Sequence, residues 1–193
     1  TSDQDFKTIT SKWLQKSVDH KYSYQFEWLG VPIIQLPTDL VIFKEIVWKT
    51  KPDLIIEIGT NEGGGALYLS DLLLINDIKG EIHTIDINNK FSYQLKSIPN
   101  IKCFVDGWEN YNIDLTRKFN KILVIEDSAH TFECTIGAIN KFAPIVSIGS
   151  YLIVEDGIID QIGMKKLFNG GPLRSINKFL LNNTEFIVDR NYC

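Results

Sequence analysis

Acidic residues stand at or near the ends of several apolar segments of this sequence. They are Glu57, Asp86, Asp106, Glu126, Asp127, Glu155 and Asp156. Carboxylates can accept hydrogen bonds from hydroxyl groups, pair with a cation or bind a metal ion. His130 follows Asp127 by three positions, and an imidazole with an ordinary pKa of about 6.5 can act as a general base. The pattern indicates a site that binds a polar ligand and moves a proton.

A glycine-rich turn follows the first of these apolar segments. It reads Glu57-Ile58-Gly59-Thr60-Asn61-Glu62-Gly63-Gly64-Gly65. Glycine tolerates positive φ and lets a ligand approach the backbone, and the next helix offers unpaired N–H groups. The GxGxxG pattern of dinucleotide-binding folds is broken at Asn61, and the GKS or GKT of a P-loop is missing. Glu57 and Glu62 would repel a pyrophosphate, so the turn favours a ligand with a positive charge.

S-adenosylmethionine meets these requirements because it carries both an amino group and a sulfonium. Asp86, at the end of the next apolar segment, can accept hydrogen bonds from two ribose hydroxyls. NAD has such a ribose too, so Asp86 alone does not separate the two cofactors. The turn could also be a tight junction without a ligand, but three consecutive glycines would then weaken a helix start to no benefit.

Short apolar segments alternate with helical patterns after residue 51. The predicted strands are Leu54–Ile58, Glu81–Ile87, Ile101–Asp106, Lys121–Asp127, Ser150–Asp156 and Glu185–Val188, and the predicted helices are Gly65–Leu74, Thr131–Val146 and Gly171–Asn182. Strands that are apolar throughout imply a parallel sheet with both faces covered. We therefore expect an α/β fold, a doubly wound, mostly parallel sheet with helices on both faces. Its ligands should bind at the carboxyl ends of the strands, where the acids gather.

Residues 1–50 are predicted to form an N-terminal helical appendage packed on the α/β domain of residues 51–193. Apolar residues at helical spacing predict one helix over Phe6–Val18. A second helix should begin with a cap at Thr38 or Asp39 and end before Lys51-Pro52. Aromatic residues gather between and within these helices, where they could pack on the core, cover an acceptor or form an oligomer contact. They are Trp13, Tyr22, Tyr24, Phe26 and Trp28.

The composition excludes several classes of protein. The chain has 193 residues and a net charge of −4, a size that suits one domain. A mildly acidic chain without a run of lysine or arginine gives no sign of a nucleic-acid partner. Neither a membrane span nor a signal peptide is visible, so we expect no membrane partner and a cytoplasmic protein. The cysteines are Cys103, Cys134 and Cys193, an odd set without CxxC that predicts free thiols.

Several segments together resemble one known family. They are Trp28-Leu29-Gly30-Val31-Pro32, Leu36-Pro37-Thr38-Asp39-Leu40, Glu45-Ile46-Val47-Trp48, Lys51-Pro52-Asp53-Leu54-Ile55-Ile56-Glu57-Ile58-Gly59-Thr60, Gly63-Gly64-Gly65-Ala66-Leu67, Thr84-Ile85-Asp86-Ile87, Asp127-Ser128-Ala129-His130 and Gly149-Ser150-Tyr151-Leu152-Ile153-Val154-Glu155-Asp156. In order and spacing they resemble the cephalosporin hydroxylase family, which includes rhamnosyl O-methyltransferases. The resemblance covers roughly Trp28 to Asp189. It implies the Rossmann-like class I methyltransferase fold and an S-adenosylmethionine site.

The resemblance also implies roles for individual residues. Three residues of the turn would line the methionine end of the cofactor, Asp86 would hold the ribose, and Asp106 and Trp108 would contact or cover the adenine. With two further residues of the turn, the expected cofactor-binding set is Glu57, Gly59, Thr60, Gly63, Gly64, Asp86, Asp106 and Trp108. His130 sits where a general base or a substrate-orienting group would act, and we place Asp127 beside it as the second catalytic residue.

Magnesium is the further cofactor that the resemblance implies. Its ligands would be the second acid of an Asp-Ser-Asp-His motif and a later Glu-Asp pair. Here that second acid is Ala129, while Glu155 and Asp156 remain. Magnesium prefers hard oxygen ligands and often uses few carboxylates plus waters, so this pair could still hold it, but more weakly. The change from an acid to Ala129 favours His130, rather than magnesium, as the group that activates the acceptor hydroxyl.

The leading hypothesis is an S-adenosylmethionine-dependent O-methyltransferase. Its acceptor would be a hydroxyl of a sugar or a small natural product, with His130 as base and magnesium as an assistant. The aromatic N-terminal segment makes a homo-oligomer plausible. One alternative is a non-catalytic or oligomeric binding protein that retains the fold. Another is an NAD-dependent oxidoreductase, which would need GxGxxG and a Ser-Tyr-Lys or similar set that the sequence lacks.

Overall fold

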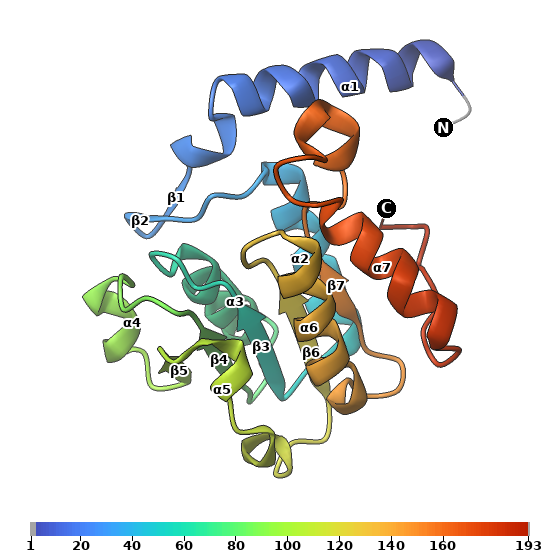
Figure 1. Cartoon of the computed structure of the whole chain (residues 1–193). Coiled ribbons are helices and arrows are strands. Elements are labelled where there is room, and N and C mark those ends of the chain that lie inside the picture. The colour runs from blue at the N-terminus through green and yellow to red at the C-terminus, as the bar shows by residue number, and fades with distance from the viewer. Residues whose placement is uncertain (1–2, 193) are drawn as a thin grey trace.

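The computed structural model describes residues 3–192, which fold around one five-stranded sheet (Figure 1). The strands are β3 (Leu54–Ile58), β4 (Glu81–Ile85), β5 (Ile101–Phe104), β6 (Ile122–Glu126) and β7 (Leu152–Val154). Their order is β5-β4-β3-β6-β7, and every neighbouring pair is parallel. The sheet grows outward from β3 in both directions, so the switch point lies between β3 and β6. The predicted doubly wound parallel fold is confirmed.

Helices cover both faces of the sheet because successive strand residues point to opposite sides. Ile55 of β3 belongs to a core cluster with residues of α2 (Pro37–Thr50) and α3 (Gly64–Ile75). The next residue, Ile56, belongs to a second cluster with Phe142 of α6 (Phe132–Phe142). The remaining helices are α1 (Gln4–Asp19), α4 (Tyr93–Ser97), α5 (Gly107–Asn110) and α7 (Gly171–Asn182), with short turns η1 (Tyr22–Gln25), η2 (Ile113–Thr116), η3 (Ala143–Ile145) and η4 (Asp160–Met164).

Two of the helix boundaries that differ from the prediction lie at a proline. Neither Thr38 nor Asp39 caps α2, which begins at Pro37 with Leu36 as the capping residue, because proline already has the φ of a first helical position. The helix predicted to run to Val146 ends at Phe142 and continues only as the short turn η3, which contains a proline near its start. Proline cannot donate the backbone hydrogen bond of a continuing α-helix.

The appendage begins with α1, which has no buried residue and lies across the top of the molecule in Figure 1. The predicted loop after it contains a small antiparallel ribbon, β1 (Glu27–Trp28) with β2 (Val31–Pro32). The ribbon turns at Leu29 and Gly30, both with positive φ, as a two-residue hairpin requires. Trp28 anchors it, donating from Nε1 to Asp71 of α3 at 2.8 Å. The division into 1–50 and 51–193 stays a prediction.

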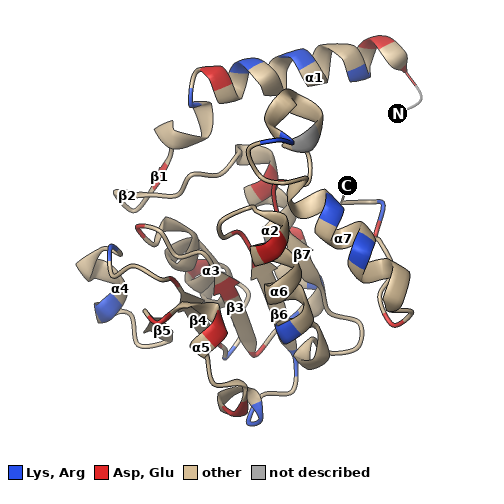
Figure 2. Cartoon of the chain, viewed as in Figure 1, with Lys and Arg blue, Asp and Glu red and all other residues tan. Residues whose placement is uncertain are grey.

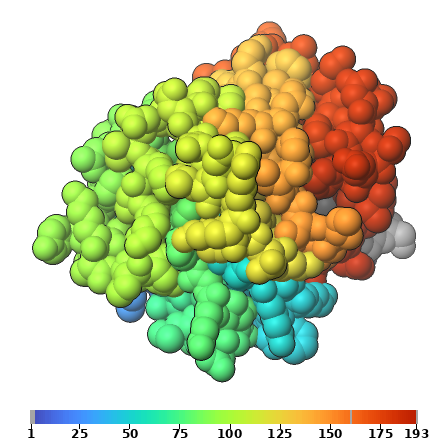
Figure 3. All heavy atoms as spheres, turned by 90° about the horizontal axis from the view of Figure 1, so that it is seen from below, coloured from blue at the N-terminus to red at the C-terminus, as the bar shows by residue number. Residues whose placement is uncertain are grey.

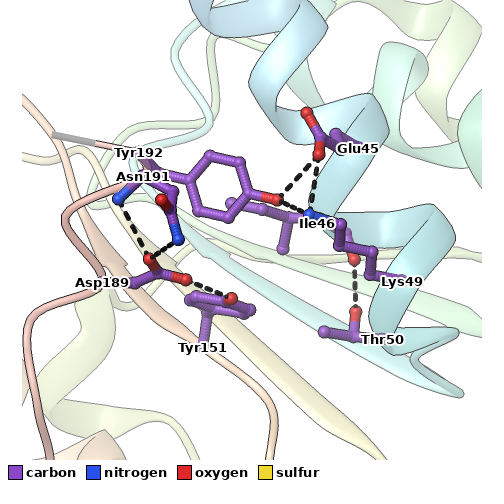
Figure 4. A network of polar contacts seen from close by, with 8 residues as sticks. All are labelled: Glu45, Ile46, Lys49, Thr50, Tyr151, Asp189, Asn191 and Tyr192. Carbon is purple, nitrogen blue, oxygen red and sulfur yellow. Dashed lines mark hydrogen bonds and ion pairs between the residues drawn. The ribbon is translucent and has the colours of Figure 1, made fainter.

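The prediction of a last strand over Glu185–Val188 is wrong. This segment pairs with no strand, and Ile187 is 89% exposed, so its apolar alternation finds no face to bury. Polar contacts hold the tail instead (Figure 4). Tyr151 donates to Asp189 at 2.7 Å, and the Tyr192 hydroxyl lies 2.5 Å from Lys49 Nζ and 3.1 Å from a Glu45 oxygen. The tail is thereby tied to α2.

Removing this tie should loosen the tail without unfolding the domain. In Tyr192→Phe, trypsin should cleave at Arg190 faster than in the wild type, because local opening depends on the few contacts of that segment. The melting temperature should stay within about 3 °C of the wild type. Tyr93→Phe is the matched control, because Tyr93 is 82% exposed in α4. Equal cleavage rates in both variants would contradict the anchoring role.

Two further features concern the whole chain. Among residues 3–192, no helix is long and apolar enough to cross a membrane. Cys103 and Cys134 are free thiols, as predicted, and Cys193 lies outside the described residues. Seen from below, the surface is formed mostly by the middle and end of the chain, with a cyan patch from around residue 50 at its lower edge (Figure 3). The candidate site lies at the opposite end, toward α1.

Candidate active site

The glycine turn between β3 and α3 is held in close contact with the end of β6. Gly59 has φ of 108°, and a Cβ there would overlap the backbone carbonyl of Asp127. Gly63 has φ of 99° and caps α3. Only glycine adopts these conformations without strain. The turn and the Asp127 loop therefore form one surface at the switch point of the sheet.

Asp86 is fixed beside this turn. Its two carboxylate oxygens accept backbone N–H groups of Asn61 at 2.9 Å and Asn88 at 2.8 Å. Each oxygen retains a lone pair, so the carboxylate can still accept from two vicinal hydroxyls. Asp106 lies nearby, because the next residue, Gly107, donates to the Asp86 carbonyl at 3.1 Å. The predicted ribose and adenine residues are thus neighbours.

Trp108 lies against α6. Its ring would be 2.6 Å from a Cβ at Gly137, and its Nε1 donates to Cys134 Sγ at 3.3 Å. The ring therefore uses the space that Gly137 leaves open. It forms a half-buried apolar wall next to Asp106, which suits the predicted contact with an adenine.

Glu57 is buried beneath the glycine turn. It accepts a hydrogen bond from the Thr84 hydroxyl, which in turn lies 2.6 Å from the Thr60 hydroxyl. The Thr60 side chain is thus linked to Glu57 through the Thr84 hydroxyl. Burial, with a smaller contribution from the charge of Asp86, raises the pKa of Glu57 to about 8. Near neutral pH this carboxyl group is largely protonated until a cation approaches.

His130 lies among carboxylates at the ends of β6 and β7. Its Nε2 is 3.3 Å from Asp156 and 4.0 Å from Asp127, and its ring meets the ring of Phe168 edge to face at 5.8 Å. Both His130 and Asp156 have φ of 56°, a left-handed backbone conformation that is uncommon for residues other than glycine. The structure brings together the two predicted catalytic residues and one of the two predicted metal ligands.

Asp127 and Glu155 share one amide donor, Gln35. The Nε2 atom of Gln35 is 2.6 Å from a Glu155 oxygen and 3.1 Å from an Asp127 oxygen. Burial raises the pKa of both carboxyl groups well above the ordinary range, and neighbouring carboxylates raise them further. Burial also raises the pKa of Asp39, with a smaller contribution from Asp156. Figure 2 shows acidic residues on several loops at this end of the sheet.

The family description Rhamnosyl O-methyltransferase/CmcI matches residues 20–192. The chain belongs to this family. The rhamnosyl O-methyltransferase of Mycobacterium leprae is 24% identical over 159 residues, covering 79% of this chain and 69% of that protein. The rhamnosyl O-methyltransferase of Mycobacterium tuberculosis (strain H37Rv) is 26% identical over 173 residues, covering 83% and 71%. The resemblance seen in the sequence is thereby confirmed.

Solved structures share the fold. A structure of CmcI with SAH has a TM-score of 0.64 at 21% identity, covering 86% of this chain and 75% of that one. A structure of CmcI with Mg and SAM has a TM-score of 0.61 at 18% identity, covering 81% and 67%. TomG from Streptomyces achromogenes, an O-methyltransferase in complex with SAM, has a TM-score of 0.58 at 13% identity, covering 94% and 78%. The chain is an S-adenosylmethionine-dependent O-methyltransferase with the class I fold.

The residues of this methyltransferase do not fit the all-oxygen magnesium site that the resemblance implied. Ala129 offers no ligand, and one oxygen of Glu155 is engaged by Gln35. The groups that come within 4.8 Å of one another are Asp127, His130 and Asp156, a set that includes an imidazole nitrogen. Magnesium favours oxygen ligands at near-octahedral positions. Glu155 and Asp156 are neighbours here, but only Asp156 faces His130.

Gln35 and Asp39 are the site residues that sequence reasoning missed. Gln35 is a single polar residue among apolar neighbours, and the sequence indicates for Asp39 only a possible helix cap. Their partners lie about a hundred positions away in sequence, so no local pattern marks them.

A cavity of about 660 Å³ lies elsewhere in the methyltransferase, around the edge strand β5. His83, Phe91, Lys96 and Lys102 are among its lining residues, and none of the predicted site residues lines it. We place the active site at the glycine turn because hydrogen-bonded carboxylates and His130 converge there. The cavity at β5 has one carboxylate, Glu81, paired with His83 and Lys118, and no glycine-rich turn.

Proposed function

We propose that this methyltransferase transfers the methyl group of S-adenosylmethionine to a hydroxyl of a sugar or small natural product, with His130 as general base. The observation that carries the proposal is the position of His130, whose Nε2 faces Asp156 and Asp127 beside the glycine turn. The names of the relatives, rhamnosyl O-methyltransferase, support a sugar hydroxyl as the acceptor. TomG is described as involved in Tomaymycin synthesis, which supports the natural-product class.

The reaction is a displacement in which a new O–C bond forms as the C–S bond breaks. The chain orients the two reactants in line and excludes water. Neutral His130 can accept the proton of the acceptor hydroxyl at its unprotonated ring nitrogen. The resulting imidazolium is then stabilised by Asp156 at 3.3 Å and by Asp127 at 4.0 Å. The leaving group is neutral S-adenosylhomocysteine.

Calorimetry tests the cofactor. We expect heat of binding with S-adenosylmethionine and none with NAD. In Asp86→Ala the affinity for S-adenosylmethionine should fall by about tenfold or more, because hydrogen bonds to a charged acceptor contribute about 1.5–3 kcal/mol. Asp114→Ala is the matched control, since Asp114 is exposed and paired with Arg117. No binding of either cofactor would leave only a non-catalytic protein with this fold. Binding of S-adenosylmethionine without transfer to any hydroxyl acceptor would favour the same alternative.

The affinity for S-adenosylmethionine should rise with pH as Glu57 ionises. Its carboxyl group has a pKa of about 8 in the free protein, and the cationic cofactor favours the ionised form, so binding releases a proton. Between pH 6 and 8 the affinity should rise by up to about tenfold per pH unit. The raised pKa also means that the cofactor-free fold loses stability as the pH rises from 4.5 toward 8, because the folded state binds more protons than the unfolded one.

Glu57→Gln should remove both pH effects. Glu27→Gln, a change at an exposed residue of the appendage, should retain them. Isothermal calorimetry across the pH range gives the affinity and, in two buffers of different ionisation enthalpy, the released proton. A pH-independent affinity in the wild type would contradict the role given to Glu57.

Four further aspects belong to the same proposal. For magnesium, the CmcI structure with Mg and SAM favours assistance at Glu155 and Asp156, whereas Ala129 and the Gln35 amide disfavour it, and we expect transfer to continue in the presence of a chelator. A homo-oligomer is supported by apolar residues that α1 leaves exposed, among them Phe6, Ile9 and Trp13, and light scattering measures it. A cytoplasmic location is supported by free thiols without a CxxC pair, and cell fractionation tests it. The acidic composition supports a small molecule, not nucleic acid, as the partner.

A further inference from the structure

The segment between β2 and α2 lies directly over the start of α3. Gly64 makes this possible, because a Cβ there would lie only 2.8 Å from the Cα of Ile33 and would overlap the Pro32 carbonyl. Ile33 is buried, and Pro37 begins α2 four residues later. The backbone on either side of Gln35 is therefore held by the glycine turn and by α2. Gln35 itself is 8% exposed.

The Gln35 side chain ends between two carboxylates. Its Nε2 lies 2.6 Å from Oε2 of Glu155 and 3.1 Å from Oδ2 of Asp127. A primary amide has two N–H donors on this nitrogen, so each carboxylate receives one. A single nitrogen atom thus bridges β6 and β7 at their carboxyl ends.

A divalent cation shared by these two oxygens would compete with that nitrogen for the same space. Magnesium lies about 2.0–2.1 Å from each oxygen ligand, a position that overlaps the Gln35 amide. The amide nitrogen is a donor and cannot serve as a ligand. The other oxygens near this point belong to Asp127 and Asp156 beside His130, a group that could hold a metal ion only with an imidazole nitrogen among its ligands.

We propose that the amide of Gln35 takes the place of a divalent cation between Asp127 and Glu155, so that this enzyme positions its catalytic loops without a metal. Gln35 is then a positioning residue, acting through Asp127 on the loop that carries His130. The amide is neutral, so it supplies hydrogen bonds but no positive charge to the two carboxyl groups. The inference deepens the proposed function and rests on it only where activity is measured.

Binding of Mn²⁺, followed by its electron paramagnetic resonance signal, tests the proposal without any substrate. The wild type should leave the signal of free Mn²⁺ unchanged. Gln35→Glu places a third carboxylate between Asp127 and Glu155 and should bind Mn²⁺ at least about tenfold more tightly than the wild type. Thr38→Glu adds the same charge at an exposed position three residues away and should behave as the wild type. Circular dichroism checks that each variant is folded.

The wild type provides a second measurement that needs no variant. Its affinity for S-adenosylmethionine, and its transfer rate with an accepted hydroxyl, should be the same with and without EDTA. Tight Mn²⁺ binding by the wild type, including binding at Asp127, His130 and Asp156, would overturn the proposal. So would a loss of transfer in EDTA, or a folded Gln35→Glu that gains no Mn²⁺ affinity. A wild type that binds no S-adenosylmethionine would refute the proposed function and leave the Mn²⁺ comparison valid.

Discussion

Replacing His130 by asparagine is expected to lower kcat by about 100- to 10,000-fold, the range that a general base contributes. Asparagine is the suitable replacement because residue 130 has φ of 56°, a conformation that asparagine tolerates better than alanine. It also keeps a polar group of similar size but has no basic nitrogen. The affinity for S-adenosylmethionine should change by less than about threefold, because binding the cofactor does not require the base.

A transfer assay with labelled cofactor measures kcat, and calorimetry measures the affinity. His20→Asn is the matched control, since His20 ends α1 far along the chain from the site. The control should retain full activity. If His130→Asn kept more than about a tenth of wild-type kcat, the base would have to be another group. If it lost both cofactor affinity and thermal stability, His130 would be structural.

The sheet could be predicted because its two central strands, β3 and β6, are apolar or buried at every residue. Each of the five residues of β3, from Leu54 to Ile58, is buried, and the same holds for β6. Such runs are typical of parallel strands covered on both faces. Once the sheet is known, the carboxyl ends of its strands must share one edge. The meeting of the glycine turn, Asp86 and the His130 loop follows from that alone.

The contacts of Gln35 could not be predicted in this way. Gln35 bonds to Asp127, 92 positions away, and to Glu155, 120 positions away. Such pairs depend on how a loop crosses the finished sheet, which no local periodicity records. The prediction of a last strand was wrong for a related reason. Glu185–Val188 alternates like a strand, but strand formation requires a partner edge and a face to bury, and the tail is held by Asp189 and Tyr192 instead.

The stability of the fold should be sensitive to a single methyl group added to the glycine turn at Gly59. Gly59→Ala is expected to destabilise the fold by about 3–5 kcal/mol, the sum of a strained backbone and an overpacked contact. The strain arises because φ is 108°, and the contact arises because the new Cβ would overlap the carbonyl of Asp127. The melting temperature should fall by about 10 °C. Moving Asp127 to relieve the overlap would also displace the Gln35 bridge and the His130 loop.

Substitutions at two other glycines distinguish the effect of backbone strain from that of the overpacked contact. Gly30 has φ of 78° but nothing within 4 Å of a Cβ, so Gly30→Ala should cost only the strain, about 1 kcal/mol or slightly more. Gly157 has open space and no positive φ, so Gly157→Ala should leave the melting temperature nearly unchanged. In differential scanning calorimetry, the loss of melting temperature should be largest for Gly59→Ala, smaller for Gly30→Ala and smallest for Gly157→Ala. If Gly59→Ala were no less stable than Gly30→Ala, the contact between the turn and Asp127 would contribute nothing. The glycine at position 59 would then serve the backbone conformation alone, and the turn could not fix the position of the catalytic loop.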